Sequence, residues 1–400
     1  MTTTASGALK GVKVVDLTRV LAGPLCTQML ADHGAQVVKV EPPSGDETRG
    51  LGPPFDGDGD AAYFLALNRG KQAISLDLSK PEAQDVLHRL LADADVLVEN
   101  FLPGTLERWG LGYEQTLSAR YPRLIHCSIT GFGNDGPLGG LPGYDAVLQA
   151  MCGLMSINGD ECSGTTRVGM PIVDHLTGYV ALTGILMALQ ARHASGQGQR
   201  VEATLYDTAL SLLLPHASNW FASKDSPRLL GSAHPNIAPY DKFRAQDGEL
   251  FIGILNDAQF RRLGVCLGLP DLPDDARFAS NSLRVGHRAA LKAVIEAAIA
   301  DRPCGPLCEA LMRAGVPAGA VNSVPQALAH AHCEHRDIVV RRENYTGLRS
   351  PMRLLGTPGA PGARPPGFAQ DTETILAGLG YAKEDRQRLR EMGAAPGPRS

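Results

Sequence analysis

One carboxylate lies where this sequence could do chemistry. Asp174 stands between an apolar loop and the run from Leu176 to Leu189, in which only Thr177 and Thr183 interrupt apolar or small residues. An Asp at such a junction is most often a helix N-cap, because its oxygens accept backbone N–H groups that have no partner within the helix. We therefore expect Asp174 at the N-cap of a helix that is buried nearly all round. Spacing alone favours this capping role over a catalytic one.

Other reactive patterns are weaker than this one. The segment HAHCEHR at 330–336 is dense in possible metal ligands, but its spacings do not place three of them on one helical face, so we expect no metal site. Eight cysteines are scattered without a CxxC pair or a nucleophile motif, and no GxSxG elbow is present. The loop GNDGPLGGLPG fits neither the dinucleotide nor the phosphate-loop pattern. By elimination, the best-placed reactive group is a carboxylate.

Composition and charge exclude several classes of protein. The 400 residues suggest two domains, and 44% hydrophobic with 20% charged residues is ordinary for a globular protein. A net charge of −4 gives no electrostatic case for nucleic acid. The N-terminus is short and polar, and the most apolar run is shorter than the roughly 18 residues a membrane span needs. We expect a cytoplasmic protein with reduced thiols and no membrane partner.

Short apolar runs alternate with helical segments in the first half of the chain. The runs are 12–17, 36–40, 73–78, 96–99, 124–130 and 200–205, and Pro24 and Pro81 suit the first turns of intervening helices, with Ser79 as a cap. This rhythm predicts an α/β fold with a parallel sheet covered by helices on both faces. Ligands bind beyond the carboxyl ends of such strands. Those ends carry Thr18-Arg19, Glu41, Asn100 and residues 131–136, which predicts a polar site there.

The sequence changes in texture after about residue 223. We expect a strand at 250–255, a helix capped by Asn256 and Asp257, and amphipathic helices at 288–300 and 304–314. These elements predict a smaller α+β domain at about 226–325. Further helices are expected at 371–379 and 384–392, with a disordered tail at the Pro- and Gly-rich end.

Several segments, taken together and in order, resemble CoA-transferase family III, also called the CaiB/BaiF family. The resemblance covers about residues 8–395. Its markers are LKGVKVVDLTRVLAGP, GAQVVKVEPPSGDETR, FLALNRGKQAISLDL, ADVLVENFLPGTLERWGL, SITGFGNDGP, GYDAVLQAMCGLMS, the segment around Asp174, GQGQRVEATLYD, AHPNIAPYDKFRAQDGELFIGILNDAQF and GVPAGAVNS.

The resemblance implies an enzyme that moves CoA from an acyl-CoA donor to a carboxylate acceptor. It implies a Rossmann-like large domain beginning at 1–225, a small α+β domain at 226–325, and a C-terminal return to the large domain at 326–400. It also implies an interlocked homodimer and no permanently bound cofactor, with the CoA thioester as substrate. Asp174 would be the nucleophile, forming a mixed anhydride and then an aspartyl-CoA thioester.

The family's CoA-binding positions carry over by motif. The resemblance assigns them to Leu21, Ala22, Leu76, Asp77, Asn100, Phe101, Arg108, Gly143 and Tyr144. Arg108 suits a phosphate group, because a guanidinium matches phosphate geometry. The chain departs from some members at Pro42 and Pro142, where they have basic residues. It also has only Gly231 in LLGSAHPNIAP, where some have four glycines.

Two other functions stay open beside a CoA-transferase. The first is an α-methylacyl-CoA racemase of the same fold, whose branch resembles GHD where this chain has Gly143-Tyr144-Asp145, so that Tyr144 replaces the acid/base histidine. The second is a non-catalytic acyl-CoA-binding protein, against which the retained Asp174 argues. Among transferases, the GYDAVLQAMCGLMSINGD segment looks closest to the dicarboxylate branch, which uses succinyl-CoA or another dicarboxylyl-CoA.

Overall fold

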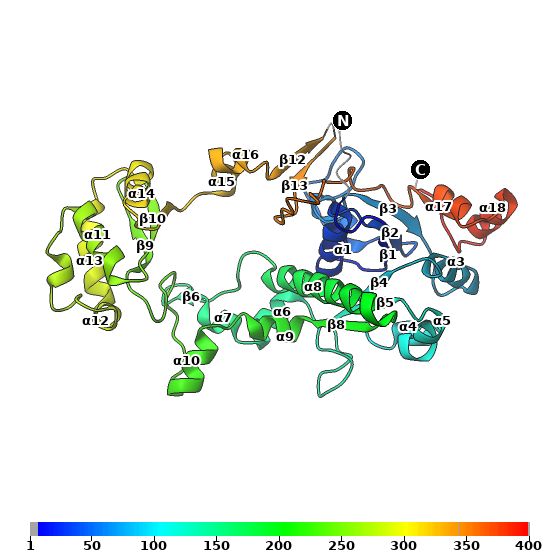
Figure 1. Ribbon diagram of the computed structural model, residues 1–400, viewed down its shortest axis with the longest axis horizontal. Helices are drawn as coiled ribbons and strands as arrows, with labels where there is room; N and C mark the ends of the chain where they lie inside the picture. Colours follow the sequence, from blue (N-terminus) through cyan, green and yellow to red (C-terminus); the bar gives the residue numbers. More distant parts are fainter. Residues whose placement is uncertain (1–6, 343, 399–400) are drawn as a thin grey trace. The chain divides into compact units, whose positions relative to one another are not determined.

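A six-stranded parallel sheet forms the centre of the larger of two compact units (Figure 1). The structure, a computed structural model, describes residues 7–342 and 344–398. The strands are β1 (Lys13–Asp16), β2 (Gln36–Glu41), β3 (Lys71–Ser75), β4 (Val96–Glu99), β5 (Ile125–Thr130) and β8 (Arg200–Thr204), in the order β3-β2-β1-β4-β5-β8. This confirms the predicted parallel sheet. The order reverses between β1 and β4, and sheets of this topology bind ligands at such a point.

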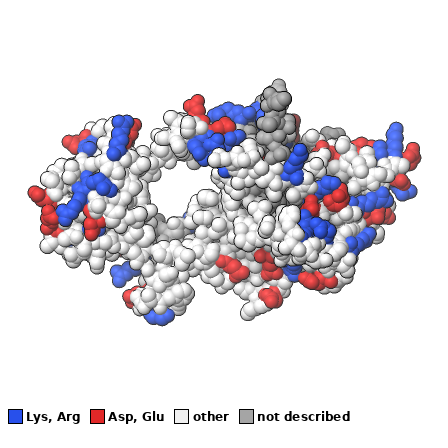
Figure 2. Space-filling model, in the orientation of Figure 1, with Lys and Arg blue, Asp and Glu red and all other residues white. Residues whose placement is uncertain are grey.

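The chain crosses between the two units four times, because it enters unit 2 twice and returns to unit 1 twice. Unit 1 comprises Met1–Cys152, Gly169–Leu212 and Glu334–Ser400, and unit 2 comprises Gly153–Val168 and Leu213–Cys333. The sequence placed the smaller domain at 226–325. Basic and acidic side chains are interspersed over the face of the units seen in Figure 2, in keeping with 38 Lys and Arg against 42 Asp and Glu.

Helices cover both faces of the sheet in unit 1. On one face α3 (Pro81–Leu91), α17 (Thr372–Gly378) and α18 (Lys383–Glu391) share a hydrophobic core with the strands. On the other face α1 (Ala22–Asp32) and α8 (Ile172–Ser195) pack together and against the strands. Because both faces are covered, the central strands are almost continuously buried, polar residues included, rather than alternating between buried and exposed positions. The shorter helices of unit 1 are η1 (Glu47–Gly50), α2 (Ala62–Leu65), α4 (Thr105–Arg108), η2 (Tyr113–Leu117), α5 (Ser118–Arg120), α6 (Asp145–Met151) and α9 (Leu205–Ser211).

The third strand differs from its prediction for an electrostatic reason. β3 begins at Lys71, before the expected start at residue 73, and ends at Ser75 rather than at residue 78. Lys71 is buried, with its Nζ 3.0 Å from Oδ2 of Asp16. In a sequence, a charged residue indicates the end of a buried strand. It can nevertheless lie inside a sheet when an opposite charge is buried beside it.

Helix α8 is longer and less buried than predicted. It runs for 24 residues and ends at Ser195, and the following Gly196 closes the helix with a φ of 74°, a conformation that favours glycine. Val180 and Met187 are exposed, at 41% and 67%. The expectation of a helix buried nearly all round is therefore wrong. Among the described residues, α8 alone has the length and composition to cross a membrane, although the core helix of a soluble protein passes the same test.

Two predicted helix caps have different outcomes. Asn256 caps α11 (Asp257–Leu267) by accepting the backbone N–H of Gln259, as predicted. Ser79 does not cap α3, whose N-cap residue is Lys80, and its hydroxyl donates to Asp77 instead. Pro81 does begin that helix.

Unit 2 contains an antiparallel sheet and its own hydrophobic core. Its strands are β9 (Tyr240–Arg244), β10 (Glu249–Gly253) and β11 (Ala318–Ala320), with β10 in the middle. Helices α11, α13 (Arg288–Ile299) and α14 (Cys304–Arg313) pack on them around Phe243, Phe260 and Phe278. The other elements assigned to this unit are α7 (Leu154–Ile157), β6 (Gly159–Asp160), β7 (Gly164–Thr165), α10 (His216–Ser223), η3 (Leu272–Asp274), α12 (Asn281–Gly286) and α15 (Val324–Leu328).

The C-terminal segment completes unit 1. After α16 (Ala331–His335) it forms a hairpin of β12 (Val339–Arg342) and β13 (Tyr345–Leu348), followed by α17 and α18. Ala394 and Ala395 are buried, and the carbonyl of Ala394 accepts the backbone N–H of Asp77. The expected disordered tail is therefore wrong for 393–398, and residues 399 and 400 lie outside the described part.

Candidate active site

A cavity of about 240 Å³ opens at the carboxyl ends of the parallel strands in unit 1. It lies where the segments following β1, β4, β5 and β8 meet, which includes the switch point between β1 and β4. This is the edge that the sequence predicted for a ligand site. Its walls consist of Arg19, Val20, Leu21, Ala22, Glu47, Asn100, Phe101, Leu102, Pro103, Ile129, Thr130, Gly131, Leu141, Pro142, Gly143, Tyr144, Asp174 and Leu205.

The structure brings most of the predicted site residues to this cavity. Asp174 lines it together with six of the nine CoA positions, namely Leu21, Ala22, Asn100, Phe101, Gly143 and Tyr144. Leu76, Asp77 and Arg108 lie elsewhere. Leu76 is buried in the core, Asp77 bonds Ser79, and Arg108 is exposed on α4 with its guanidinium on the hydroxyl of Thr105.

Asp174 does not cap its helix. Pro171 is the N-cap residue of α8, and Asp174 is the third residue of the helix. The capping acceptor comes from α6, where Oδ2 of Asp145 accepts the backbone N–H groups of Val173 and Asp174 at 2.7 and 3.1 Å. Because another carboxylate satisfies these N–H groups, the side chain of Asp174 is released from capping and lines the cavity.

Asp145 is a site residue that the sequence analysis did not single out. It is buried, and Nε2 of Gln149, one turn along α6, donates to its Oδ1 at 2.6 Å. Its only sequence signal was its place in the Gly143-Tyr144-Asp145 motif. It fixes the start of α8 relative to α6 and places a second carboxylate close to Asp174.

The surroundings of Asp174 disfavour its charged form. Burial, and then the neighbouring charge of Asp145, raise the pKa of Asp174 to about 7. Within the described residues, no hydrogen-bond donor is directed at the carboxylate of Asp174. A substantial share of the molecules is therefore protonated at Asp174 at neutral pH, unlike at an ordinary aspartate. A carboxylate that is poorly solvated and lacks a counterion is a stronger nucleophile than one in water.

Tyr63 on α2 also lies in the electrostatic field of this site. Burial raises its pKa to about 12, with further contributions from the charges of Asp174, Asp145 and Asp46. The phenol therefore stays protonated at neutral pH and remains able to donate a hydrogen bond. The sequence gave no pattern that would have marked this residue.

The loops following β1 and β4 are joined by reciprocal hydrogen bonds. Oδ1 of Asn100 accepts the backbone N–H of Arg19 at 2.9 Å, and Nδ2 of Asn100 donates to the carbonyl of Arg19 at 2.8 Å. The guanidinium of Arg19 pairs with Glu47 at 2.8 Å and lies 5.9 Å from the ring centre of Phe101. Two predicted CoA-binding positions, Asn100 and Phe101, are thus part of one rigid corner of the cavity.

Possible metal ligands and cysteines of the described residues were the other candidates for chemistry. In the part of the chain that the structure describes, no group of three or more His, Cys, Asp or Glu side chains is arranged to hold a metal ion. The HAHCEHR segment lies on and around the short helix α16. All eight cysteines are free, and five of them are buried.

Comparisons with known proteins identify the family. The family model described as CoA-transferase family III matches residues 9–372. A succinate–glutarate CoA-transferase from Agrobacterium fabrum is 40% identical over 361 residues, covering 88% of this chain and 90% of that protein. The succinyl-CoA:glutarate CoA-transferase of Mus musculus is 38% identical, covering 84% of this chain and 77% of that protein.

A solved structure agrees with these matches. The crystal structure of a CaiB/BaiF family protein from Brucella suis superposes with a TM-score of 0.84 at 41% identity, covering 94% of this chain and 100% of that one. The resemblance found in the sequence is thereby confirmed. This chain belongs to CoA-transferase family III, the CaiB/BaiF family, and is a CoA-transferase.

Proposed function

We propose that this enzyme moves CoA from succinyl-CoA, or another dicarboxylyl-CoA, to a carboxylic acid acceptor by covalent catalysis at Asp174. The printed names of the relatives support the substrate class, since the proteins from A. fabrum and M. musculus are named for succinate or succinyl-CoA and glutarate. One observation carries the mechanism. Asp174 lines the cavity with a raised pKa, while Asp145 does the capping that usually occupies such an Asp.

Four exchanges complete the proposed cycle. The Asp174 carboxylate attacks the thioester carbonyl, the C–S bond breaks, and CoA leaves as a thiolate from the resulting mixed anhydride. The thiolate then attacks Cγ of Asp174, which releases the donor acid as its carboxylate and leaves an aspartyl-CoA thioester. The acceptor carboxylate attacks Cγ and expels the thiolate again. The thiolate finally attacks the acceptor's acyl carbon, which forms the product thioester and restores the Asp174 carboxylate.

The four exchanges together indicate which groups the site must supply. Each step exchanges one acyl bond for another without a net change in electrons, so the proposed cycle needs no resident cofactor beyond the CoA thioester itself. Developing oxyanions need hydrogen-bond donors, and we assign this role to backbone N–H groups in the loops lining the cavity. Tyr63 adds a protonated phenol near the same carboxylates.

The proposed CoA-binding residues are supported by their places in the structure to different degrees. We propose that Leu21, Ala22, Asn100 and Phe101 bind CoA together with Gly143 and Tyr144, because all six line the cavity that contains Asp174. CoA is larger than this cavity. We therefore keep Arg108, with its exposed guanidinium, as a contact for a phosphate group, and Asp77 for the outer part of the molecule, while Leu76, whose side chain is buried in the core, is kept on the family resemblance alone.

We further propose that two chains interlock as a homodimer. Helices of unit 1 expose large apolar side chains that a second copy would cover. They include Tyr144, Val147 and Met151 on or beside α6, Val180 and Met187 on α8, and Leu210 on α9. Light scattering of the purified enzyme should give twice the chain mass, whereas a monomer would refute the dimer. A cytoplasmic location with reduced thiols, and domain bounds at 225 and 325, also remain proposals.

Trapping of the intermediate tests the proposed function. The enzyme is incubated with succinyl-CoA and then treated with hydroxylamine or borohydride, and the peptide containing Asp174 is examined by mass spectrometry. We expect a hydroxamate or a reduced side chain at Asp174 only when succinyl-CoA is present. An unmodified Asp174 during measurable CoA transfer would refute the covalent mechanism. Hydrogen–deuterium exchange at the α-carbon without CoA transfer would indicate a racemase instead.

A further inference from the structure

The segment Thr18–Ala22 forms one wall of the cavity in an unfavourable backbone conformation. Four of its residues, from Arg19 to Ala22, line the cavity. Val20 has a φ of 69°, in the left-handed region that β-branched side chains rarely adopt. Such a conformation persists only where the surroundings hold it in place, and residues of this kind gather at binding sites.

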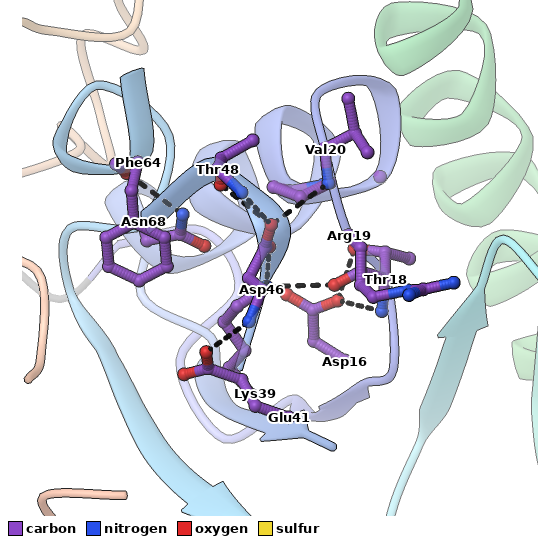
Figure 3. Close-up of polar contacts among 12 residues, drawn as sticks. Asp16, Thr18, Arg19, Val20, Lys39, Glu41, Asp46, Thr48, Phe64 and Asn68 are labelled. Carbon is purple, nitrogen blue, oxygen red and sulfur yellow. Dashed lines mark hydrogen bonds and ion pairs between the residues drawn. The ribbon is translucent and has the colours of Figure 1, made fainter. Parts of the chain in front are cut away.

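One buried carboxylate anchors this segment at its centre. Oδ1 of Asp46 accepts the backbone N–H of Val20 at 3.4 Å. The same oxygen accepts the backbone N–H of Thr48 at 3.0 Å and the hydroxyl of Thr48 at 2.7 Å. Its other oxygen, Oδ2, lies 2.9 Å from Nζ of Lys39. Figure 3 shows these contacts converging on Asp46, beside the segment. Asp46 itself is not among the residues that line the cavity.

Lys39 and Asp16 anchor the segment at its start. Nζ of Lys39 donates to the carbonyl of Thr18 at 2.8 Å. Oδ1 of Asp16 accepts both the backbone N–H and the hydroxyl of Thr18, at 2.9 and 2.5 Å. These three charged residues are at most 2% exposed. The contacts of Thr18 with Asp16 and Lys39 are therefore charge-assisted, short and shielded from water, and that of Val20 with Asp46 is charge-assisted but longer.

Further charged residues hold Asp46 and Asp16 in place. The backbone N–H of Asp46 donates to Glu41 at 2.9 Å, and Glu41 forms two hydrogen bonds with the guanidinium of Arg49. Lys71 supplies a second buried positive charge beside Asp16. Lys39 and Lys71 thus balance Asp16 and Asp46. A balanced set of buried charges tolerates little movement, because any displacement leaves a charge without its partner.

We propose that Asp46 and Lys39 are positioning residues for CoA binding. They hold Val20 in its left-handed conformation and thereby fix the wall formed by Arg19, Leu21 and Ala22 against which the CoA thioester binds. Neither residue touches the ligand. The proposal rests on the proposed function, because it assumes that CoA occupies this cavity. It goes beyond that function in assigning the affinity for CoA partly to residues beneath the wall.

The test compares Asp46→Asn with Lys39→Met in the full-length enzyme. Asn retains the size and helix-capping ability of Asp but loses the ion pair, and Met has nearly the shape of Lys. We expect each variant to bind free CoA about 10- to 100-fold more weakly by calorimetry, with a matching rise in KM for succinyl-CoA. Asp58→Asn, an exposed aspartate in the neighbouring loop, is the control and should bind CoA like the wild type.

A rescue separates positioning from mere stability. Glycine adopts positive φ without strain, so Val20→Gly in the Asp46→Asn background should recover much of the lost CoA affinity without raising the melting temperature. Unchanged CoA affinity in both single variants would overturn the proposal. The proposal would also be overturned if the CoA affinities of all variants simply followed their melting temperatures. A wild-type enzyme that binds CoA but transfers none would instead refute the proposed function.

Discussion

Two walls of the cavity use buried carboxylates in opposite ways. Beneath the segment after β1, burial alone would raise the pKa of Asp16, but two lysines and two threonines lower it to about 2. On the wall formed by α6 and α8, burial and the charge of Asp145 raise the pKa of Asp174 to about 7. The two side chains belong to the same residue type in the same unit, and they differ in the sign of their neighbours' charges.

The difference separates a structural carboxylate from a reactive one. Asp16 is charged at neutral pH, and both of its oxygens have partners, so it can hold the backbone but is not free to attack a thioester. The charged neighbour of Asp174 is the carboxylate of Asp145, and its negative charge destabilises the anionic form of Asp174. Burial therefore has no fixed meaning for function, and the charge placed beside the buried group decides its role.

The strongest way to break this comparison is to remove the reactive carboxylate. Asp174→Ala should lower CoA transfer from succinyl-CoA at least about 1000-fold, because the covalent step loses its nucleophile. Exchange of CoA esters is followed by mass spectrometry. Asp225→Ala, at an exposed aspartate, is the matched control and should keep the wild-type rate. A rate within tenfold of the wild type in Asp174→Ala would show that the reaction does not pass through this residue.

Removing the structural carboxylate should affect stability first. Asp16→Asn leaves Lys71 and Lys39 buried with less compensating charge, which should lower the free energy of unfolding by about 3–5 kcal/mol at pH 7. Urea denaturation measures this loss. Asp274→Asn, which breaks an exposed ion pair with Arg261, is the control and should cost less than about 1 kcal/mol. A loss at Asp16 no larger than at Asp274 would contradict the assignment.

The pH dependence of that loss has a defined sign. The folded pKa of Asp16 lies below its ordinary value of 3.8, so its stabilising contribution is present above that value. It is lost as the pH falls towards about 2. The difference between wild type and Asp16→Asn should therefore narrow on acidification and stay constant between pH 5 and 7.

At Asp174, unlike at Asp16, we expect substitution by Asn to stabilise the folded enzyme. Because the folded pKa of Asp174 is raised from 3.8 to about 7, ionisation destabilises the folded enzyme as the pH rises through 7. Asp174→Asn should therefore increase the free energy of unfolding by about 2–4 kcal/mol at pH 8, allowing for partial exposure. The increase should fade as the pH drops towards 4. Equal stabilisation at both pH values would mean that charge is not its cause.

The smallest predicted effect concerns the neighbour of Asp174. Asp145→Asn removes the like charge but keeps an oxygen that can accept the N–H groups at the start of α8. The pKa of Asp174 should then fall, and the lower limb of the profile of kcat/KM against pH should move to lower pH by up to about 1 unit. A shift to higher pH would show that Asp145 does not act on Asp174 through its charge.

Sequence periodicity was sufficient for the sheet and its binding edge. Apolar runs located all six strands to within three residues at each end, and the rule for strand ends identified Arg19, Asn100 and Gly131 as neighbours. These predictions succeed because they depend on local patterns and on the fixed direction of parallel strands. The role of Asp174 came from the family motif, since its spacing alone favoured an N-cap.

The residues that escaped prediction depend on contacts between distant segments. Asp145 caps a helix 29 positions further along the chain, and no local pattern reveals such a pairing. Lys71 and Asp16 are 55 positions apart, and each alone reads as a surface charge. Tyr63 is marked only by the carboxylates around it. In each case the deciding partner is supplied by folding, which sequence periodicity does not describe.

The late position of α17 and α18 has a consequence for synthesis of the protein. Their side chains Ile375, Leu376 and Leu389, with Ala394 and Ala395, complete the hydrophobic core over one face of the sheet. All of unit 2 leaves the ribosome before these residues do. The nascent chain must therefore keep a nearly finished sheet with one apolar face covered only in part, by α3, a state prone to aggregation, until the last residues are made. Release of the chain, rather than formation of its strands, sets the moment at which unit 1 becomes complete.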